Sequence, residues 1–295
     1  MIADSATDVF EEHRPLLMGV AYRMLGRVAD AEDVVQDAWL RWYQADRAEV
    51  REPRAYLVRI TTRLAIDRLR QVQARGETYV GPWLPEPYLT EFADTAPDTE
   101  ERAVLADTVS VAVLVVLESL SPLERAVFVL REAFGYPYAE IAALLDRGEP
   151  AVRQLAGRAR RHVAEGRPRY EVDPARRRDL TERLLAAVAE GDLEGLMSML
   201  ALDVRLVGDS GGKAKAPVRT LHTADKVGRF LVGAAARSVP ADLSLSVLEV
   251  NGGPAVLLLS GGRPDSLFQL DIADDRVTAV YVLRNPDKLR YLAGL

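Results

Sequence analysis

Cysteine is absent from the 295-residue chain, and histidine occurs only three times. These absences exclude a disulfide framework and a thiolate zinc site, and they fit a reducing compartment such as the cytoplasm. The apolar run at residues 109–120 is too short to span a bilayer, and no basic segment leads into an apolar run at the N-terminus. We expect a cytoplasmic protein with no signal peptide, membrane span, metal site or cofactor.

Positive charge is also scarce, with 38 Lys and Arg against 44 Asp and Glu, for a net charge of −6. The basic residues are nevertheless concentrated in segments 47–75 and 147–169. Because phosphate binding depends on the local cluster of charge, both segments remain candidates for contact with nucleic acid. The length and the 48% hydrophobic content allow two or three globular domains.

Segment 121–163 has the pattern of a helix-turn-helix. Apolar residues within 138–145 have the i, i+3, i+4 spacing of a buried helix face, and a break at 146–150 contains Gly and Pro. The following helix, 151–163, is apolar on one side and rich in arginine on the other. Arg and Gln can bond guanine and adenine edges, so this helix is a candidate for the DNA major groove. The alternative is an ordinary solvated helix.

Two more helical patterns precede this stretch. Helix 30–43 has an acidic start and an apolar stripe, which favours either a normal amphipathic helix or a docking surface. Helix 53–71 begins with Pro53 and interleaves arginines with Tyr56 and aliphatic residues. That mixture suits a surface that grips a nucleic-acid backbone, although a solvated helix face would also produce it.

Segment 76–99 is rich in Pro, Gly and acids, as is typical of a linker. Inside it lies the motif WLPEP at 83–87, whose Trp and Leu we expect to pack against another part of the protein. A helix at 100–120 follows, and its apolar stretch 111–117 is predicted to be buried.

The last 126 residues, 170–295, are predicted to form an α+β domain with helices first and an antiparallel sheet after. A Gly-rich loop at 209–213 lacks the spacing of a phosphate-binding loop, and its glycines favour a tight turn or a close approach of another segment. The expected helices are 174–190, 192–200 and 224–236, and the expected strands are 203–209, 243–250, 254–260, 266–272 and 276–284.

Three motifs in order, DAEDVVQDAW, PRAYLVRITTRLAIDRLR and LSPLERAVFVLREAFGYPYAEIAALL, resemble the extracytoplasmic-function sigma factors of bacterial RNA polymerase over residues 8–165. The remainder is similar to a subgroup with a fused SnoaL-like domain. That subgroup has a WLPEP motif, a DGGGK loop that appears here as DSGGK with Ser210 in place of a glycine, and an NPDKL motif.

The resemblance implies a multidomain fold. Two all-α sigma domains, a helical bundle at 1–75 and a helix-turn-helix at 101–169, would be joined by a Pro-rich acidic linker at 76–100. An α+β SnoaL-like cone-shaped barrel would follow at 170–295. The implied function is that of an alternative sigma factor, whose partners are the β′ clamp and β flap of core RNA polymerase and promoter DNA.

The resemblance also assigns roles to residues. Core polymerase would contact the acidic helix through Asp30, Glu32, Asp33, Gln36 and Asp37. The opened −10 promoter element would be bound by Arg54, Arg59, Arg63, Arg68 and Arg70. The duplex −35 element would be read by Arg153, Gln154, Arg158, Arg160 and Arg161.

For the C-terminal domain we hypothesise regulation through the linker. The segments involved are Trp83, Leu84, Pro85, Glu86 and Pro87; Asp209, Gly211, Gly212 and Lys213; and Asn285, Pro286, Asp287, Lys288 and Leu289.

Some SnoaL-like relatives are enzymes that use Asp and His, and here the candidates are Asp203, Asp209 and His222. We find no triad spacing and expect no catalytic residues. A small ligand could occupy a cavity of this domain, although no residue pattern specifies one. The alternative functions are a ligand-sensing helix-turn-helix repressor, or a DNA-binding module fused to a SnoaL-type enzyme.

Overall fold

A computed structural model describes residues 2–46, 50–75, 79–89, 110–166, 174–237 and 242–293. The chain divides into two compact units, which are treated separately. One comprises Met1–Glu77 and Val113–Gly166, and the other comprises Thr78–Ala112 and Arg167–Leu295. The end of the predicted linker, 90–100, and the predicted start of the next helix at residue 100 lie outside the described residues.

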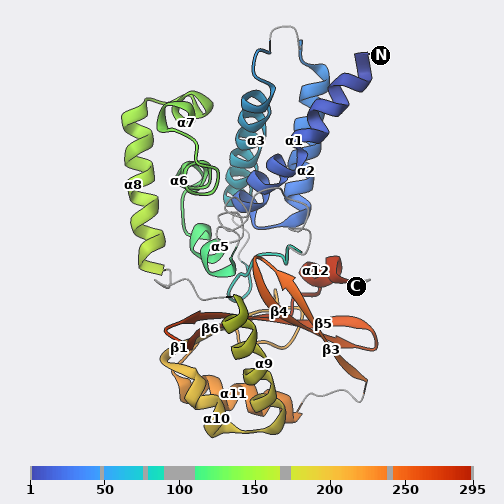
Figure 1. Cartoon of the computed structure of the whole chain (residues 1–295), viewed down its shortest axis with the longest axis vertical. Coiled ribbons are helices and arrows are strands. Elements are labelled where there is room, and N and C mark those ends of the chain that lie inside the picture. Colours follow the sequence, from blue (N-terminus) through green and yellow to red (C-terminus); the bar gives the residue numbers. More distant parts are fainter. Residues whose placement is uncertain are drawn as a thin grey trace. The chain divides into compact units, whose positions relative to one another are not determined.

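The first unit begins with three helices that pack together, α1 (Ile2–Leu25), α2 (Val28–Gln44) and α3 (Pro53–Arg75) (Figure 1). α1 ends at Leu25, because Gly26 has a positive φ of 65° that stops the helix. The stripe predicted for α2 is buried, and the indole of Trp42 donates a 2.9 Å hydrogen bond to the carbonyl of Ala6 in α1. α2 is thereby fixed against α1 with its acidic side outward.

The same unit continues with α5 (Val111–Glu118), α6 (Pro122–Phe128), the π-helix η3 (Val129–Ala133), α7 (Tyr138–Leu145) and α8 (Glu149–Gly166). A capping box of Ser121 and Glu124 starts α6. α7 ends at Asp146, whose φ of 56° lies in the left-handed region, and Pro150 lies in the first turn of α8. The predicted helix-turn-helix is confirmed.

The two helical halves of this unit are packed on each other. Arg125 of α6 is only 3% exposed and donates to the carbonyl of Met24 at 2.7 Å and to Glu118 at 2.9 Å. Burial lowers the pKa of Arg125, and Glu118 opposes that shift. Arg125 of α6 therefore caps the carboxyl end of α1. A second contact joins the halves, because the guanidinium of Arg23 in α1 lies 5.2 Å from the ring centre of Phe134.

The second unit contains a six-stranded sheet with the order β2-β1-β6-β5-β4-β3. Its strands are β1 (Leu200–Asp209), β2 (Leu221–His222), β3 (Leu243–Val250), β4 (Gly253–Ser260), β5 (Arg263–Ala273) and β6 (Arg276–Leu283). Three helices pack on the sheet, α9 (Pro174–Glu190), α10 (Leu193–Met199) and α11 (Ala224–Arg237) (Figure 1). α12 (Pro286–Leu289) and η4 (Arg290–Leu292) follow β6. The α+β prediction is confirmed.

Three details of the predicted sheet were wrong. β1 and β6 pair in parallel, so the sheet is mixed and not antiparallel. The two-residue strand β2 was not predicted. Among the described residues β2 and β3 are opposite edges that do not pair, so the sheet is open and not a closed barrel. A strand of two residues offers too few hydrogen bonds to close a barrel, and α9, α10 and α11 bury the apolar face instead.

Candidate polymerase, nucleic-acid and linker-binding sites

The predicted polymerase-contact residues lie on the outer side of α2. Glu32, Asp33, Gln36 and Asp37 are exposed, whereas Asp30 is half-buried. Leu40 and Tyr43 continue this side and are 50% and 55% exposed, which is unusual for large apolar residues. We missed both in the sequence, although their position one and two turns beyond Gln36 could have shown that they share its face.

Arg68, one of the predicted −10 contacts, is half-buried and forms an ion pair with Asp30 of α2. Its Nη2 donates to Asp30 at 2.5 Å and its Nε at 3.2 Å, so α3 is tied to α2. The hydrogen bond with Asp30 raises the pKa of Arg68. The pair joins a residue predicted for DNA to one predicted for polymerase, and sequence reasoning had treated the two as independent.

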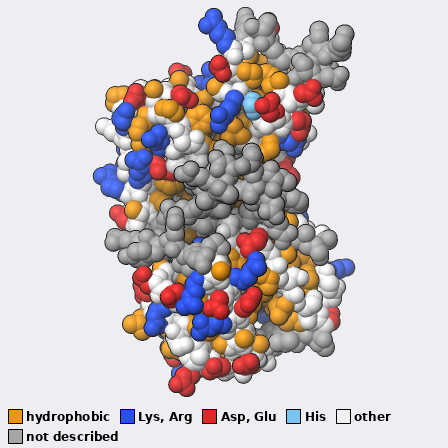
Figure 2. Space-filling model, in the orientation of Figure 1, with side chains coloured by type: hydrophobic (Ala, Val, Ile, Leu, Met, Phe, Trp, Pro, Cys, Tyr) orange, Lys and Arg blue, Asp and Glu red, His pale blue; other side chains and the backbone are white. Residues whose placement is uncertain are grey.

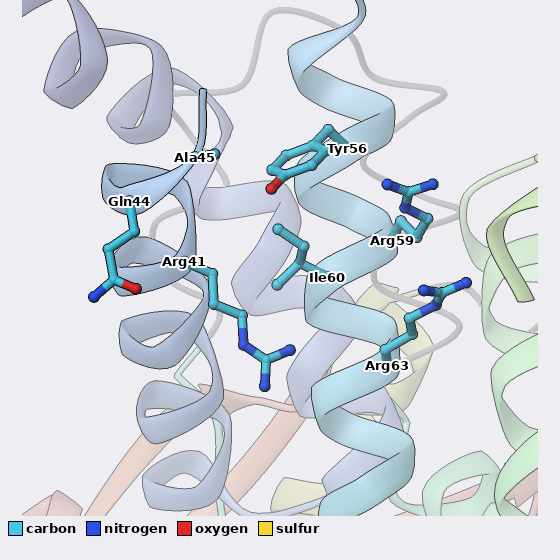
Figure 3. Close-up of a pocket in the computed structure, with 7 residues that line it drawn as sticks. All are labelled: Arg41, Gln44, Ala45, Tyr56, Arg59, Ile60 and Arg63. Atoms are coloured by element: carbon cyan, nitrogen blue, oxygen red, sulfur yellow. The ribbon is translucent and has the colours of Figure 1, made fainter. Parts of the chain in front are cut away.

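The other four arginines predicted for the −10 element, Arg54, Arg59, Arg63 and Arg70, are exposed on α3. Two of them border a shallow pocket of about 360 Å³ between α2 and α3 (Figure 3). Arg41 points from α2 into the space between the helices, and Tyr56 and Ile60 line it from α3. An aromatic ring beside several guanidinium groups can stack a base and bind its phosphates.

Arg54 is close to the second helical half. Its guanidinium lies 5.8 Å from the ring centre of Tyr136, which follows η3. A second pocket, of about 540 Å³, is lined by Tyr56 and Arg59 from α3 and by Tyr136 and Leu144 from the other half. The surface predicted for the opened strand therefore adjoins the helix-turn-helix in this arrangement.

The recognition-helix candidates all lie on the exposed side of α8, while Val152, Ala156, Ala159 and Val163 are buried on the other. The exposed residues are Arg153, Gln154, Arg158, Arg160 and Arg161. Figure 2 shows Lys and Arg side chains interleaved with Asp and Glu along the edge that α8 occupies in Figure 1. Long donors on an amphipathic helix can reach both base edges and phosphates.

In the second unit, Asp209 at the end of β1 binds the WLPEP segment. Its carboxylate is fully buried and accepts hydrogen bonds from the hydroxyl of Tyr79 at 2.5 Å, the backbone N–H of Leu84 at 2.8 Å and that of Gly211 at 3.1 Å. Lys288 of α12 completes the set at 2.7 Å. All four bonds satisfy a charge that would otherwise be costly to bury.

Lys288 binds the same linker residue from the other side. Its ammonium group donates to the carbonyl of Leu84 at 2.5 Å and lies 4.7 Å from the ring of Tyr79 and 4.5 Å from that of Trp83. Asp209 and Lys288 thus hold both the N–H and the carbonyl of Leu84. We missed Tyr79, which lies four residues before WLPEP, because a lone tyrosine in a linker gives no pattern.

The remaining signature residues surround this contact. Gly211 and Gly212 have φ values of 55° and 73°, and a Cβ at Gly211 would collide with the side-chain amide of Asn285. Asn285 donates to the hydroxyl of Tyr79 at 2.9 Å and caps α12. An exposed ion pair joins Lys213 to Asp287. Leu84, Pro85, Glu86, Pro87 and Leu289 are buried, whereas Trp83 is half-buried.

The acid–base candidates of the C-terminal domain are placed differently from one another. Asp203 and His222 are exposed, while Asp209 is buried and bonded to Lys288. Over the described part of the chain, no three His, Cys, Asp or Glu side chains are grouped as a metal ion would require. None of the helices described is both long and apolar enough to cross a membrane.

Comparison with known proteins covers nearly the whole chain. Residues 9–75 match the family Sigma-70 region 2, and residues 110–163 match Sigma-70, region 4. ECF RNA polymerase sigma factor SigJ of Mycobacterium tuberculosis is 40% identical over 288 residues, with 95% of this chain and 91% of its own length aligned. Probable ECF RNA polymerase sigma factor SigI of the same species is 33% identical, covering 97% and 95%.

The agreement extends to three dimensions. The crystal structure of the M. tuberculosis extracytoplasmic function sigma factor SigJ superposes with a TM-score of 0.75 at 38% sequence identity. The alignment covers 98% of each chain, so it includes the C-terminal α+β domain as well as both helical halves.

Proposed function

This chain belongs to the extracytoplasmic-function sigma factors, which bind core RNA polymerase and promoter DNA, and we propose that three of its surfaces divide that work. The outer side of α2 docks on the β′ clamp of the polymerase. Its four exposed polar residues supply charge and hydrogen bonds, and Leu40 and Tyr43, toward the end of the helix, supply apolar area. Protein interfaces usually combine apolar and polar surface in this way.

The pocket between α2 and α3 takes the opened strand of the −10 element. Tyr56 provides a stacking surface, and Arg41, Arg59 and Arg63 supply positive charge around it. The site suits unpaired bases because a duplex hides the faces of its bases inside the stack.

α8 enters the major groove of the −35 element. It follows the short α7–α8 turn of the helix-turn-helix, and its N-terminal end carries Arg153 and Gln154, side chains that read guanine and adenine. We assign the contact with the β flap of the polymerase to this same helical half. Binding two promoter elements with one chain raises the effective concentration of each module at its site.

The C-terminal domain modulates this activity in cis and works without catalysis in the cytoplasm. The observation that carries this part is the buried Asp209–Lys288 pair, which holds both backbone groups of Leu84. Fixing the linker at Leu84 shortens the length of chain that is free to separate the two promoter-binding halves. The domain thereby limits how far, and in what direction, the halves can part.

Transcription with purified core polymerase tests the division of work. The double substitution Leu40→Ala with Asp37→Arg should weaken binding to core polymerase and abolish all specific transcripts. Arg153→Ala should leave core binding intact and lower promoter-specific transcription by about 5- to 150-fold, because a good bidentate base contact contributes about 1–3 kcal/mol. Equal loss of core binding in both variants would contradict the assignment.

The regulatory part has its own test. Lys288→Met should change transcript yield or promoter choice, whereas Lys213→Met, which removes the same charge from an exposed pair, should not. Identical transcription from both variants would show that the linker contact is structural only.

A further inference from the structure

Two arginines of α8 are bound by glutamates from the preceding helices. Arg158 Nε donates to Glu124 of α6 at 2.7 Å, and Arg160 Nε donates to Glu132 of η3 at 2.8 Å. The arginine side chains remain 54% and 48% exposed while these bonds are made. Each of these cations, assigned above to DNA, therefore has a carboxylate in contact before any DNA arrives.

The position of Glu124 is built into the fold. One of its oxygens accepts from the backbone and hydroxyl of Ser121 in the capping box, and the other accepts from Arg158. The bond from the Ser121 hydroxyl, assisted by Arg158, lowers the pKa of Glu124. The carboxylate consequently stays charged and stays in place when Arg158 moves.

Arg153, near the start of α8, is held differently. Both its Nε and its Nη2 donate to Glu149 one turn earlier in the same helix, and its guanidinium lies 4.6 Å from the ring of Tyr138. An arginine held by a carboxylate and an aromatic ring keeps its planar guanidinium group oriented to bond a base. The pairs of Arg158 and Arg160 span two helices and lie farther along α8, and we take these two arginines to contact backbone phosphates.

Half-exposed ion pairs contribute only about 0–1 kcal/mol and are screened by salt, so DNA can break them. A phosphate that displaces a carboxylate, however, gains much less than one that meets an unpaired arginine. Phosphate contacts occur in both non-specific and specific binding, and specific binding also gains from base contacts. Competing carboxylates therefore weaken binding to any duplex and leave the contribution of the base contacts unchanged.

We propose that Glu124 and Glu132 set the affinity of α8 for duplex DNA, because Arg158 and Arg160 must leave these carboxylates before they can bind phosphates. The inference rests on the proposed role of α8 at the −35 element. Because the same ion pairs are broken on any sequence, the two glutamates lower the affinity for non-promoter and promoter duplex alike.

The test uses the full-length chain with both glutamates replaced, Glu124→Gln and Glu132→Gln. Glutamine keeps the size of the side chain and is accepted at the third position of a capping box, so α6 should remain intact. Two duplexes are compared from 50 to 300 mM salt. The first is a pool of random-sequence duplexes. The second is the duplex that the wild-type chain, together with core polymerase, selects most strongly from that pool. Binding of the free chain to each is then measured.

We expect affinity for the random pool to rise about tenfold at low salt. The slope of log K against log salt should steepen by about 1 for each arginine that gains a phosphate. Affinity for the selected duplex should rise by a similar factor, because the same two ion pairs are broken there. Adding Arg158→Gln and Arg160→Gln should remove the gain, and Glu140→Gln, an exposed charge on α7, controls for the loss of negative charge in general.

The outcomes separate this inference from the proposed role of α8. If Arg158→Gln with Arg160→Gln weakens binding to the selected duplex but the glutamine variant binds the random pool like wild type, the inference is wrong and the role of α8 stands. If neither pair of substitutions nor Arg153→Ala alters binding to either duplex, the assignment of α8 to DNA is wrong, and the inference falls with it.

Discussion

Replacing Lys288 by methionine keeps an unbranched apolar side chain, with sulfur in place of one methylene, and removes the ammonium group. In the native protein this group is 4% exposed and is bonded to the buried carboxylate of Asp209 and to the carbonyl of Leu84. The variant leaves both acceptors in the interior without this donor. Removing one partner of a buried ion pair costs about 3–5 kcal/mol.

The lower end of that range applies here, because Asp209 keeps three donors, from Tyr79, Leu84 and Gly211. We therefore expect the linker contact to weaken by about 3 kcal/mol, which corresponds to a factor of about 100 in its opening equilibrium. Lys213→Met removes a charge from a pair in which both side chains are more than half exposed. Its cost should be about 1 kcal/mol or less.

Hydrogen exchange at the Leu84 amide measures this opening directly, because that N–H donates to Asp209. Pro85 and Pro87 have no N–H, so residues 83–87 carry only the amides of Trp83, Leu84 and Glu86, and NMR follows the Leu84 amide individually. We expect exchange about 100 times faster in Lys288→Met and less than 5 times faster in Lys213→Met. If Lys288→Met exchanged within threefold of wild type, the pair would not be what fixes the linker.

Three further predictions concern stability. Arg68→Gln should destabilise the helical unit by about 1 kcal/mol, because it releases the half-buried Asp30, whereas Arg70→Gln on the same helix should have no measurable effect; thermal unfolding distinguishes them. Gly157→Ala should stabilise α8 by up to about 1 kcal/mol, since nothing lies within 4 Å of the added Cβ, and an unchanged melting temperature would contradict this. Burial raises the pKa of Tyr281 to about 12. The stability that the neutral phenol contributes, about 3 kcal/mol, should therefore be complete below pH 10 and lost as the pH rises to about 12. Tyr281→Phe should remove this part of the alkaline loss of stability, as measured by denaturant titration.

Local patterns were sufficient for most elements of the fold. Strand β3 has the bounds that its sequence predicts, Leu243–Val250, and α3 starts at Pro53 as expected. Both depend on turn residues and on periodicity over a few positions. The parallel pairing of β1 with β6 could not be predicted in this way, because the two strands are separated by more than sixty residues and pairing depends on the whole topology.

The candidate sites show the same division. The exposed arginines of α8 follow from helical spacing, since one side of the helix is apolar. The partners of those arginines do not, because Glu124 and Glu132 belong to other helices and reach α8 only after folding. Arg125 has the composition of a surface residue and is nonetheless buried, and its role depends on a carbonyl a hundred positions earlier.

The capping of α1 by Arg125 links the stability of the first helical half to the presence of the second. Binding of the two helical halves at separate promoter elements, as proposed above, takes α6 away from α1. Water must then solvate the Met24 carbonyl and the freed guanidinium. The buried guanidinium regains its hydration in that step. Separating this interface therefore costs less free energy than separating an apolar interface of equal area.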